Sequence, residues 1–130
     1  MIFIYACESM KIIKDITFQG FKVTLSNKDI TDEDITFLNT FKSKYNYGLT
    51  KMYNNYKDIL DNVTKDKFIR TIEIFSIKFS KFTNKNKDTF LILDIDYDDH
   101  NILSGHIITM TMSMNKTKNK NIEFEFQRNG

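Results

Sequence analysis

A strict alternation of apolar and polar residues in the second half of the chain constrains its fold more than any other feature. The alternation runs through residues 91–97, 108–114 and 122–126. Successive side chains of a strand point to opposite faces of a sheet, so each stretch predicts a β-strand with one covered and one solvated face. The apolar series at residues 72–79 predicts a fourth strand, and its slip of one position at Ile74–Phe75 indicates a β-bulge.

Polar turns separate these predicted strands. Residues 84–88 (NKNKD) and 115–121 (NKTKNKN) are rich in Asn and Lys. Short polar connections between successive strands predict an antiparallel meander. The dry face of such a sheet requires a cover, which another part of the chain has to supply.

Residues 31–60 carry the periodicity of helices. Thr31 is a favourable N-cap, and the three acidic residues that follow it suit the positive end of a helix. Apolar residues then recur every three or four positions over residues 35–45, and again over residues 49–60. Residues 46–48, which include Gly48, are expected to end the first helix. The pattern therefore predicts two amphipathic helices that form a helical hairpin.

The N-terminal region predicts further β-structure. Apolar positions alternate on both sides of Gln19–Gly20, which indicates two short strands or one strand with a glycine bulge. Residues 1–7 are apolar, but they are far fewer than the roughly 18 residues of a membrane span. We interpret them as a strand or an ordered arm, with Met10 as an alternative start of the protein.

These patterns predict an α+β fold in a single domain over residues 1–130. The expected architecture is a two-layer sandwich, with an antiparallel sheet of about five to six strands covered on one face by a helical hairpin, in the order β-β-α-α-β-β-β-β. Apolar residues make up 41% of the chain, which excludes a disordered protein. Its single cysteine, Cys7, has no partner for an internal disulfide, which favours a cytoplasmic location.

The charge of the chain gives no general argument for nucleic-acid binding, because the formal net charge is only +2. Lys116, Lys118 and Lys120 are interpreted as a solvated turn. Glu123 and Glu125 follow closely and would repel phosphate. We therefore expect a protein partner rather than nucleic acid or a membrane.

The densest run of chemically active residues is DIDYDDHNILSGH, residues 94–106. It contains four aspartates and both histidines of the chain: Asp94, Asp96, Asp98, Asp99, His100 and His106. Residues 96–105 are expected to connect two strands of a hairpin, since Asp, Asn, Ser and Gly favour turns. The run is open to three interpretations: a metal or catalytic site, a recognition loop, or a solvated turn.

The spacing of the run argues against a calcium loop. Asp94, Asp96 and Asp98 match the first three ligands of an EF-hand, but Asp99 stands where glycine is required and Gly105 where glutamate is required. Acid–base catalysis by an Asp–His pair stays open, although the chain has no recognisable nucleophile spacing or phosphate-binding loop. We expect no catalytic residue, metal ligand or cofactor, and we assign partner binding to Asp94, Asp96, Tyr97, Asp98, Asp99 and His100.

The order of strands and helices resembles that of small bacterial immunity proteins, which neutralise toxins of contact-dependent growth inhibition and related polymorphic toxin systems. The stretch IDYDDHNILSGHIITMTMSMN is also similar to an acidic hairpin of several bacterial families encoded near such toxins. The resemblance implies a cytoplasmic, non-enzymatic protein that neutralises a cognate toxin by tight binding. An acidic loop suits this role, because carboxylates can occupy a basic cleft and steer association.

Other functions are compatible with the sequence. One alternative is a small nucleic-acid-associated or regulatory domain. A second is a phage-encoded inhibitor of a host protein, and a third is an enzyme that uses the Asp–His run.

Overall fold

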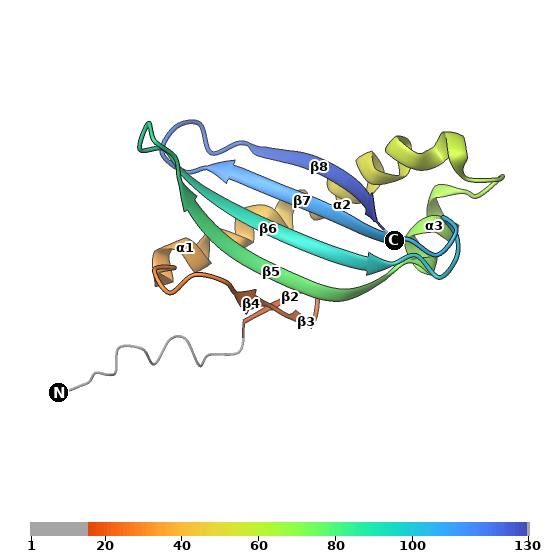
Figure 1. The fold of residues 1–130 in the computed structure, drawn as a ribbon, viewed down its shortest axis with the longest axis horizontal. Coiled ribbons are helices and arrows are strands. Elements are labelled where there is room, and N and C mark those ends of the chain that lie inside the picture. The colour runs from red at the N-terminus through yellow and green to blue at the C-terminus, as the bar shows by residue number, and fades with distance from the viewer. Residues whose placement is uncertain (1–15, 130) are drawn as a thin grey trace.

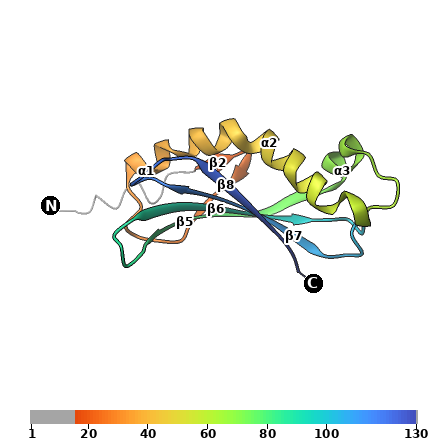
Figure 2. The same ribbon diagram turned by 90° about the horizontal axis from the view of Figure 1, so that it is seen from above.

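The computed structural model describes residues 16–129, which form a sheet and a helical layer packed on one of its faces (Figures 1 and 2). The predicted α+β fold is confirmed. The predictions for residues 1–7, Cys7 and Met10 lie outside the described residues.

The sheet has five strands in the order β4-β5-β6-β7-β8. The strands of the described chain are β2 (Thr17–Phe18), β3 (Phe21–Lys22), β4 (Thr24–Leu25), β5 (Glu73–Thr83), β6 (Thr89–Asp98), β7 (Ile107–Asn115) and β8 (Ile122–Asn129). Strands β5 to β8 form the predicted antiparallel meander, and β4 joins β5 in parallel. Strands β2 and β3 pair separately as a short hairpin around Gln19–Gly20, which confirms two short strands in this region.

Two local predictions for the sheet are confirmed. The register between β5 and β6 shifts between Ile74 and Ser76, which is the predicted bulge. The polar stretches 84–88 and 115–121 connect β5 to β6 and β7 to β8. One lysine of the second turn is not simply solvated, however, because Lys116 pairs with the buried carboxylate of Asp34.

The predicted helical hairpin is wrong. The helical layer consists of α1 (Asp32–Thr36), α2 (Leu38–Tyr56), the short 3-10 helix η2 (Lys57–Ile59) and α3 (Lys65–Thr71). Helix α2 continues through residues 46–48 and extends along the sheet as one element (Figure 2). A Cβ atom on Gly48 would lie 2.7 Å from Cε1 of Phe124 and 3.0 Å from Sδ of Met110. Gly48 therefore allows the helix to approach β7 and β8 closely, and it does not end the helix.

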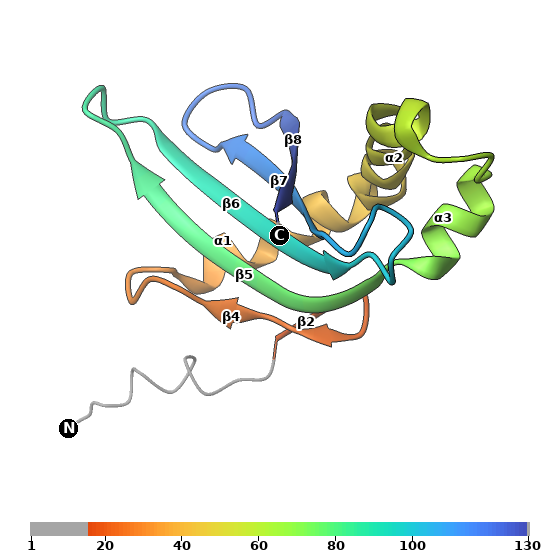
Figure 3. The same ribbon diagram turned by 45° about the vertical axis from the view of Figure 1, so that its right-hand side comes forward.

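Helix α3 lies just before the predicted strand at residues 72–79, in a segment where no helix was predicted. Thr64 caps it, since its hydroxyl accepts a hydrogen bond from the Lys67 backbone N–H at 3.1 Å. Phe68 is buried, and its ring centroid lies 5.8 Å from that of Tyr53 on α2. Seven residues are too few for a helical period to emerge from the sequence, so only the packing against α2 distinguishes this helix (Figure 3).

The hydrophobic core lies between α2 and the covered face of the sheet. Its fully buried members include Phe41, Met52, Ile77, Phe79, Leu93, Ile95, Met110 and Met112. Phe124 and Phe126 pack against this cluster as half-buried residues, as the alternation over residues 122–126 predicts for one face of a strand. No helix within residues 16–129 combines the length and the apolar character needed to cross a membrane.

Asp34 fixes the start of the helical layer to the sheet. Its backbone N–H donates to the Thr31 hydroxyl at 3.1 Å, and its carboxylate accepts from the Thr31 backbone N–H at 2.9 Å, which completes a capping box. The carboxylate is fully buried and pairs with Lys81 of β5 at 2.9 Å and with Lys116. Burial raises the pKa of Asp34, but the two lysines and Thr31 outweigh it and hold the pKa well below its usual value.

We predict that Asp34→Asn lowers the free energy of unfolding by about 3 kcal/mol at neutral pH, because it leaves two partly buried ammonium groups without their counter-charge. The lowered pKa stabilises the folded state above the ordinary value of 3.8, and this contribution is lost as the pH falls toward the folded pKa. Denaturant unfolding should therefore show that the difference between parent and variant shrinks from about pH 5 to pH 2. The exposed neighbour Asp32 provides the control, and an equally large loss in Asp32→Asn would contradict this account.

We also predict that Gly48→Ala destabilises the protein by about 1 kcal/mol, although alanine is the better helix former. The helical preference of alanine contributes about 1 kcal/mol, whereas crowding in a packed core costs about 1–3 kcal/mol. Thermal unfolding of Gly48→Ala, with the exposed helical substitution Asn46→Ala as control, measures the balance. A higher melting temperature for Gly48→Ala would show that Phe124 moves aside at little cost.

Candidate functional site

The second face of the sheet lacks a helical cover within the described residues (Figure 2). Every second residue of β5 to β8 projects onto this surface, which we call the open face. The open face consists of Glu73, Ser76, Lys78, Ser80 and Phe82 on β5, Phe90, Ile92, Asp94, Asp96 and Asp98 on β6, Ile107, Thr109, Thr111, Ser113 and Asn115 on β7, and Glu123, Glu125, Gln127 and Asn129 on β8.

The open face is strongly acidic although the chain as a whole carries a net charge of +2. Its ionisable members are six carboxylates and one lysine, Lys78. Glu73 pairs with His100 at the edge of the face, and we call the other five carboxylates the acidic band: Asp94, Asp96, Asp98, Glu123 and Glu125. Alternate residues of one strand lie about 6.8 Å apart, so the three aspartates of β6 form a regular row of negative charge. The acidic band thus concentrates negative charge on one surface, and positive charges elsewhere in the chain bring the net charge to +2.

Threonines of β7 orient two carboxylates of the acidic band. The Thr109 hydroxyl donates to Oδ1 of Asp96 at 2.6 Å, and the Thr111 hydroxyl donates to Oδ1 of Asp94 at 2.5 Å. Within residues 16–129 the second oxygen of each of these carboxylates makes no hydrogen bond, so it can accept one from another molecule. The cross-strand bonds restrict the side chains to a single orientation before any partner binds.

Apolar side chains lie beside the acidic band. Phe82 is 55% exposed, and its ring centroid is 6.4 Å from that of Phe90 on the neighbouring strand. Ile107, at the other end of the open face, is 40% exposed. Exposed aromatic and aliphatic groups next to charged groups are typical of protein interfaces. Phe82, Phe90 and the two glutamates were not predicted as site residues, although the strand alternation already placed Glu123 and Glu125 on one face.

The predicted hairpin connection at residues 96–105 is too long. Strand β6 continues through Asp98, so Asp94, Asp96 and Asp98 project from a paired strand and not from a loop. Their inclusion in the candidate surface agrees with their position on the open face.

Asp99 is buried, with 1% of its surface exposed, and this corrects its assignment as a partner-binding residue. Its carboxylate organises the connection between β6 and β7 by accepting four backbone hydrogen bonds. The donors are Asn101, Leu103, Gly105 and His106, at distances of 2.9–3.1 Å. The residue thus holds the turn together from inside.

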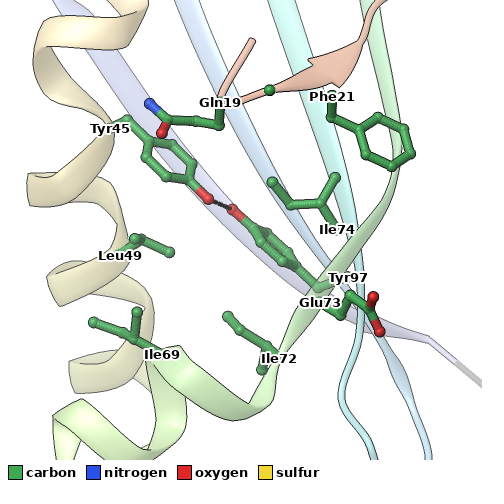
Figure 4. Close-up of a pocket in the computed structure, with 10 residues that line it drawn as sticks. Gln19, Phe21, Tyr45, Leu49, Ile69, Ile72, Glu73, Ile74 and Tyr97 are labelled. Atoms are coloured by element: carbon green, nitrogen blue, oxygen red, sulfur yellow. Dashed lines mark hydrogen bonds between the residues drawn. The ribbon is translucent and has the colours of Figure 1, made fainter.

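The assignment of Tyr97 as a partner-binding residue is also wrong, because its side chain is buried. Its side chain points to the covered face of the sheet, is 1% exposed, and meets the hydroxyl of Tyr45 on α2 at 2.7 Å (Figure 4). Because successive strand residues face opposite ways, Tyr97 is directed away from the partner surface that its neighbours Asp96 and Asp98 form.

His100 stays at the edge of the open face. Its Nε2 lies 2.8 Å from the Glu73 carboxylate, and both side chains are exposed. The hydrogen bond with Glu73, followed by the charge of Asp98, raises the pKa of His100 above its usual value. The other histidine has a different role, since Nδ1 of His106 donates to the Leu103 carbonyl at 2.5 Å within the turn.

The six assigned residues therefore separate into three groups: the outward aspartates, the inward Tyr97 and Asp99, and the ion-paired His100. Within residues 16–129 no three His, Cys, Asp or Glu side chains are grouped so that they could hold a metal ion. No family model matches the chain, and neither a curated protein nor a solved structure matches it significantly. The function has to be argued from the chemistry of the surface.

We predict that Asp99→Ala lowers the free energy of unfolding by about 3 kcal/mol, because it removes the acceptor of four backbone donors, of which the Leu103 N–H is buried. Asp98→Ala, next to it but exposed, should cost less than about 1 kcal/mol. Denaturant unfolding of both variants measures the difference. Equal losses would mean that Asp99 does not hold the turn.

Proposed function

We propose that this chain is a non-enzymatic binding protein, and specifically an immunity protein that neutralises a cognate bacterial toxin by tight binding through its open face. The observation that carries the proposal is the acidic band, a set of five carboxylates on a sheet face that no helix of residues 16–129 covers. The resemblance of the sequence to immunity proteins agrees with it.

The chemistry of the acidic band favours a basic partner surface. Carboxylates in a regular row can occupy positions that phosphates take in the cleft of a toxin that acts on nucleic acid. Complementary charge also speeds association and excludes wrong partners. Because the whole chain is nearly neutral, this attraction acts only near the open face, within a Debye length of about 8 Å at physiological salt.

The rigidity of two side chains of the acidic band also suits tight binding. Asp94 and Asp96 lie on β6, which is paired on both sides, and their carboxylates are held by Thr111 and Thr109. Side chains that are already ordered lose less entropy when a complex forms. Phe82 offers an apolar contact beside the charged groups, which is how many interfaces combine affinity with specificity.

The alternatives receive less support from the geometry. A nucleic-acid ligand would be repelled by the acidic band. Catalysis by the Asp–His run would need a histidine free to reach a reacting group, whereas His100 pairs with Glu73 at the surface and His106 is bonded within a turn.

We predict that Asp96→Lys combined with Asp98→Lys weakens toxin binding by at least about tenfold and reduces its salt dependence, while the free energy of unfolding changes by about 1 kcal/mol or less. The proposal expects the neighbouring gene to encode a toxin domain, and that domain is the partner to test, by calorimetric titration and by protection of cells that express it. Asp58→Lys combined with Asp61→Lys is the matched control, because it changes the net charge equally at exposed positions that follow α2. If both double variants bind the toxin as the parent does, the open face is not the interface.

A further inference from the structure

We propose that a cavity between α2 and the β2–β3 hairpin binds a small neutral molecule with an apolar body and a single hydrogen-bond acceptor oxygen. The cavity measures about 390 Å³ and lies on the covered side of the sheet, away from the open face (Figure 4). Sites for small ligands usually measure roughly 300–1,000 Å³. This site is independent of the proposed function, because it shares no residue with the acidic band.

The walls of the cavity come from distant parts of the chain and are mainly apolar. The turn of the β2–β3 hairpin contributes one side, α2 a second, the end of α3 and the start of β5 a third, and β6 the base. The apolar lining residues are Phe21, Leu49, Ile69, Ile72 and Ile74. A Cβ atom on Gly20, at the rim, would meet no atom within 4 Å, so the space beside this turn is open.

The polar feature of the interior is the pair of tyrosine hydroxyls. Tyr45 and Tyr97 together carry two hydroxyl protons, but the 2.7 Å contact between their oxygens uses only one. Within residues 16–129 neither hydroxyl makes another hydrogen bond. One O–H group is therefore left without an acceptor, and a buried donor in that state costs about 1–3 kcal/mol.

Burial indicates which proton is left over. Tyr97 is 1% exposed, whereas Tyr45 is 7% exposed. Either oxygen could be the donor, but an unpaired proton costs less on the less buried hydroxyl, so we assign Tyr97 as the donor to Tyr45. The Tyr45 proton is then free to point into the cavity. Burial raises the pKa of Tyr45, so its hydroxyl stays protonated at neutral pH and acts as a donor.

The charges around the cavity favour a neutral ligand. Among the described lining residues none is a lysine or an arginine, and the one carboxylate, Glu73, pairs with His100 outside the cavity. An anion would lose its hydration and gain no counter-charge, whereas a cation would find only an exposed and already paired carboxylate. A ketone, ester or ether oxygen on an apolar body meets the buried tyrosine donor without this cost, whereas the amide of Gln19, the other donor of the lining, is exposed to water.

Acetophenone and ethylbenzene provide a matched pair of probes, because they have similar shapes and differ in the carbonyl oxygen. We expect acetophenone to shift the backbone amide NMR signals of the cavity residues and to bind roughly three- to tenfold more tightly than ethylbenzene. Replacing both tyrosines, Tyr45→Phe with Tyr97→Phe, should abolish this preference and leave ethylbenzene binding in place. The control Tyr56→Phe removes a buried hydroxyl of the same helix outside the cavity and should keep the preference.

A variant that fills the cavity separates shape from hydrogen bonding. Ile69→Trp, from the wall that α3 provides, should weaken both probes equally and leave their ratio unchanged. The proposal is overturned if neither probe binds the parent protein at its solubility limit. It is also overturned if the double tyrosine variant, shown to be folded by its NMR spectrum, still prefers acetophenone.

Discussion

The described structure depends on one constraint: within residues 16–129 a single helical layer covers only one face of a five-stranded sheet. A strand turns alternate side chains to opposite faces, so every apolar residue that the long helix α2 buries is matched by a neighbour on the open face. Burial of the methionines of β7 thus places Thr109 and Thr111 outward, beside the aspartates of β6. The acidic band is the consequence of packing on the other side.

The same constraint separates two kinds of chemistry. The open face presents oriented carboxylates and exposed aromatic rings, which suit a large, positively charged partner. The covered face contains a cavity with apolar walls and one unpaired hydroxyl, which suits a small neutral molecule. Tyr97 and its neighbours Asp96 and Asp98 belong to opposite sides of this division although they are adjacent in the chain.

Signals that act over a few residues were readable in the sequence. The N-cap at Thr31 and the bulge near Phe75 were predicted because capping and strand alternation are local effects. Gly48 was wrongly predicted to end a helix. Glycine both ends helices and permits close packing, and only the proximity of Phe124 decides between these roles. Helix α3 escaped detection because it is shorter than the pattern that would reveal it.

The sequence by itself determined the four strands of the antiparallel meander, the turns at residues 84–88 and 115–121, and the acidic character of residues 94–99, since the alternation of side chains is a property of the extended backbone. Only the tertiary structure decided that Asp99 turns inward to hold a loop, that Glu123 and Glu125 join the aspartates, and that Tyr45 meets Tyr97 across 52 positions of the chain. These arrangements depend on which elements pack together. Contacts between residues far apart in sequence leave no periodic trace, so they appear only once the chain has folded.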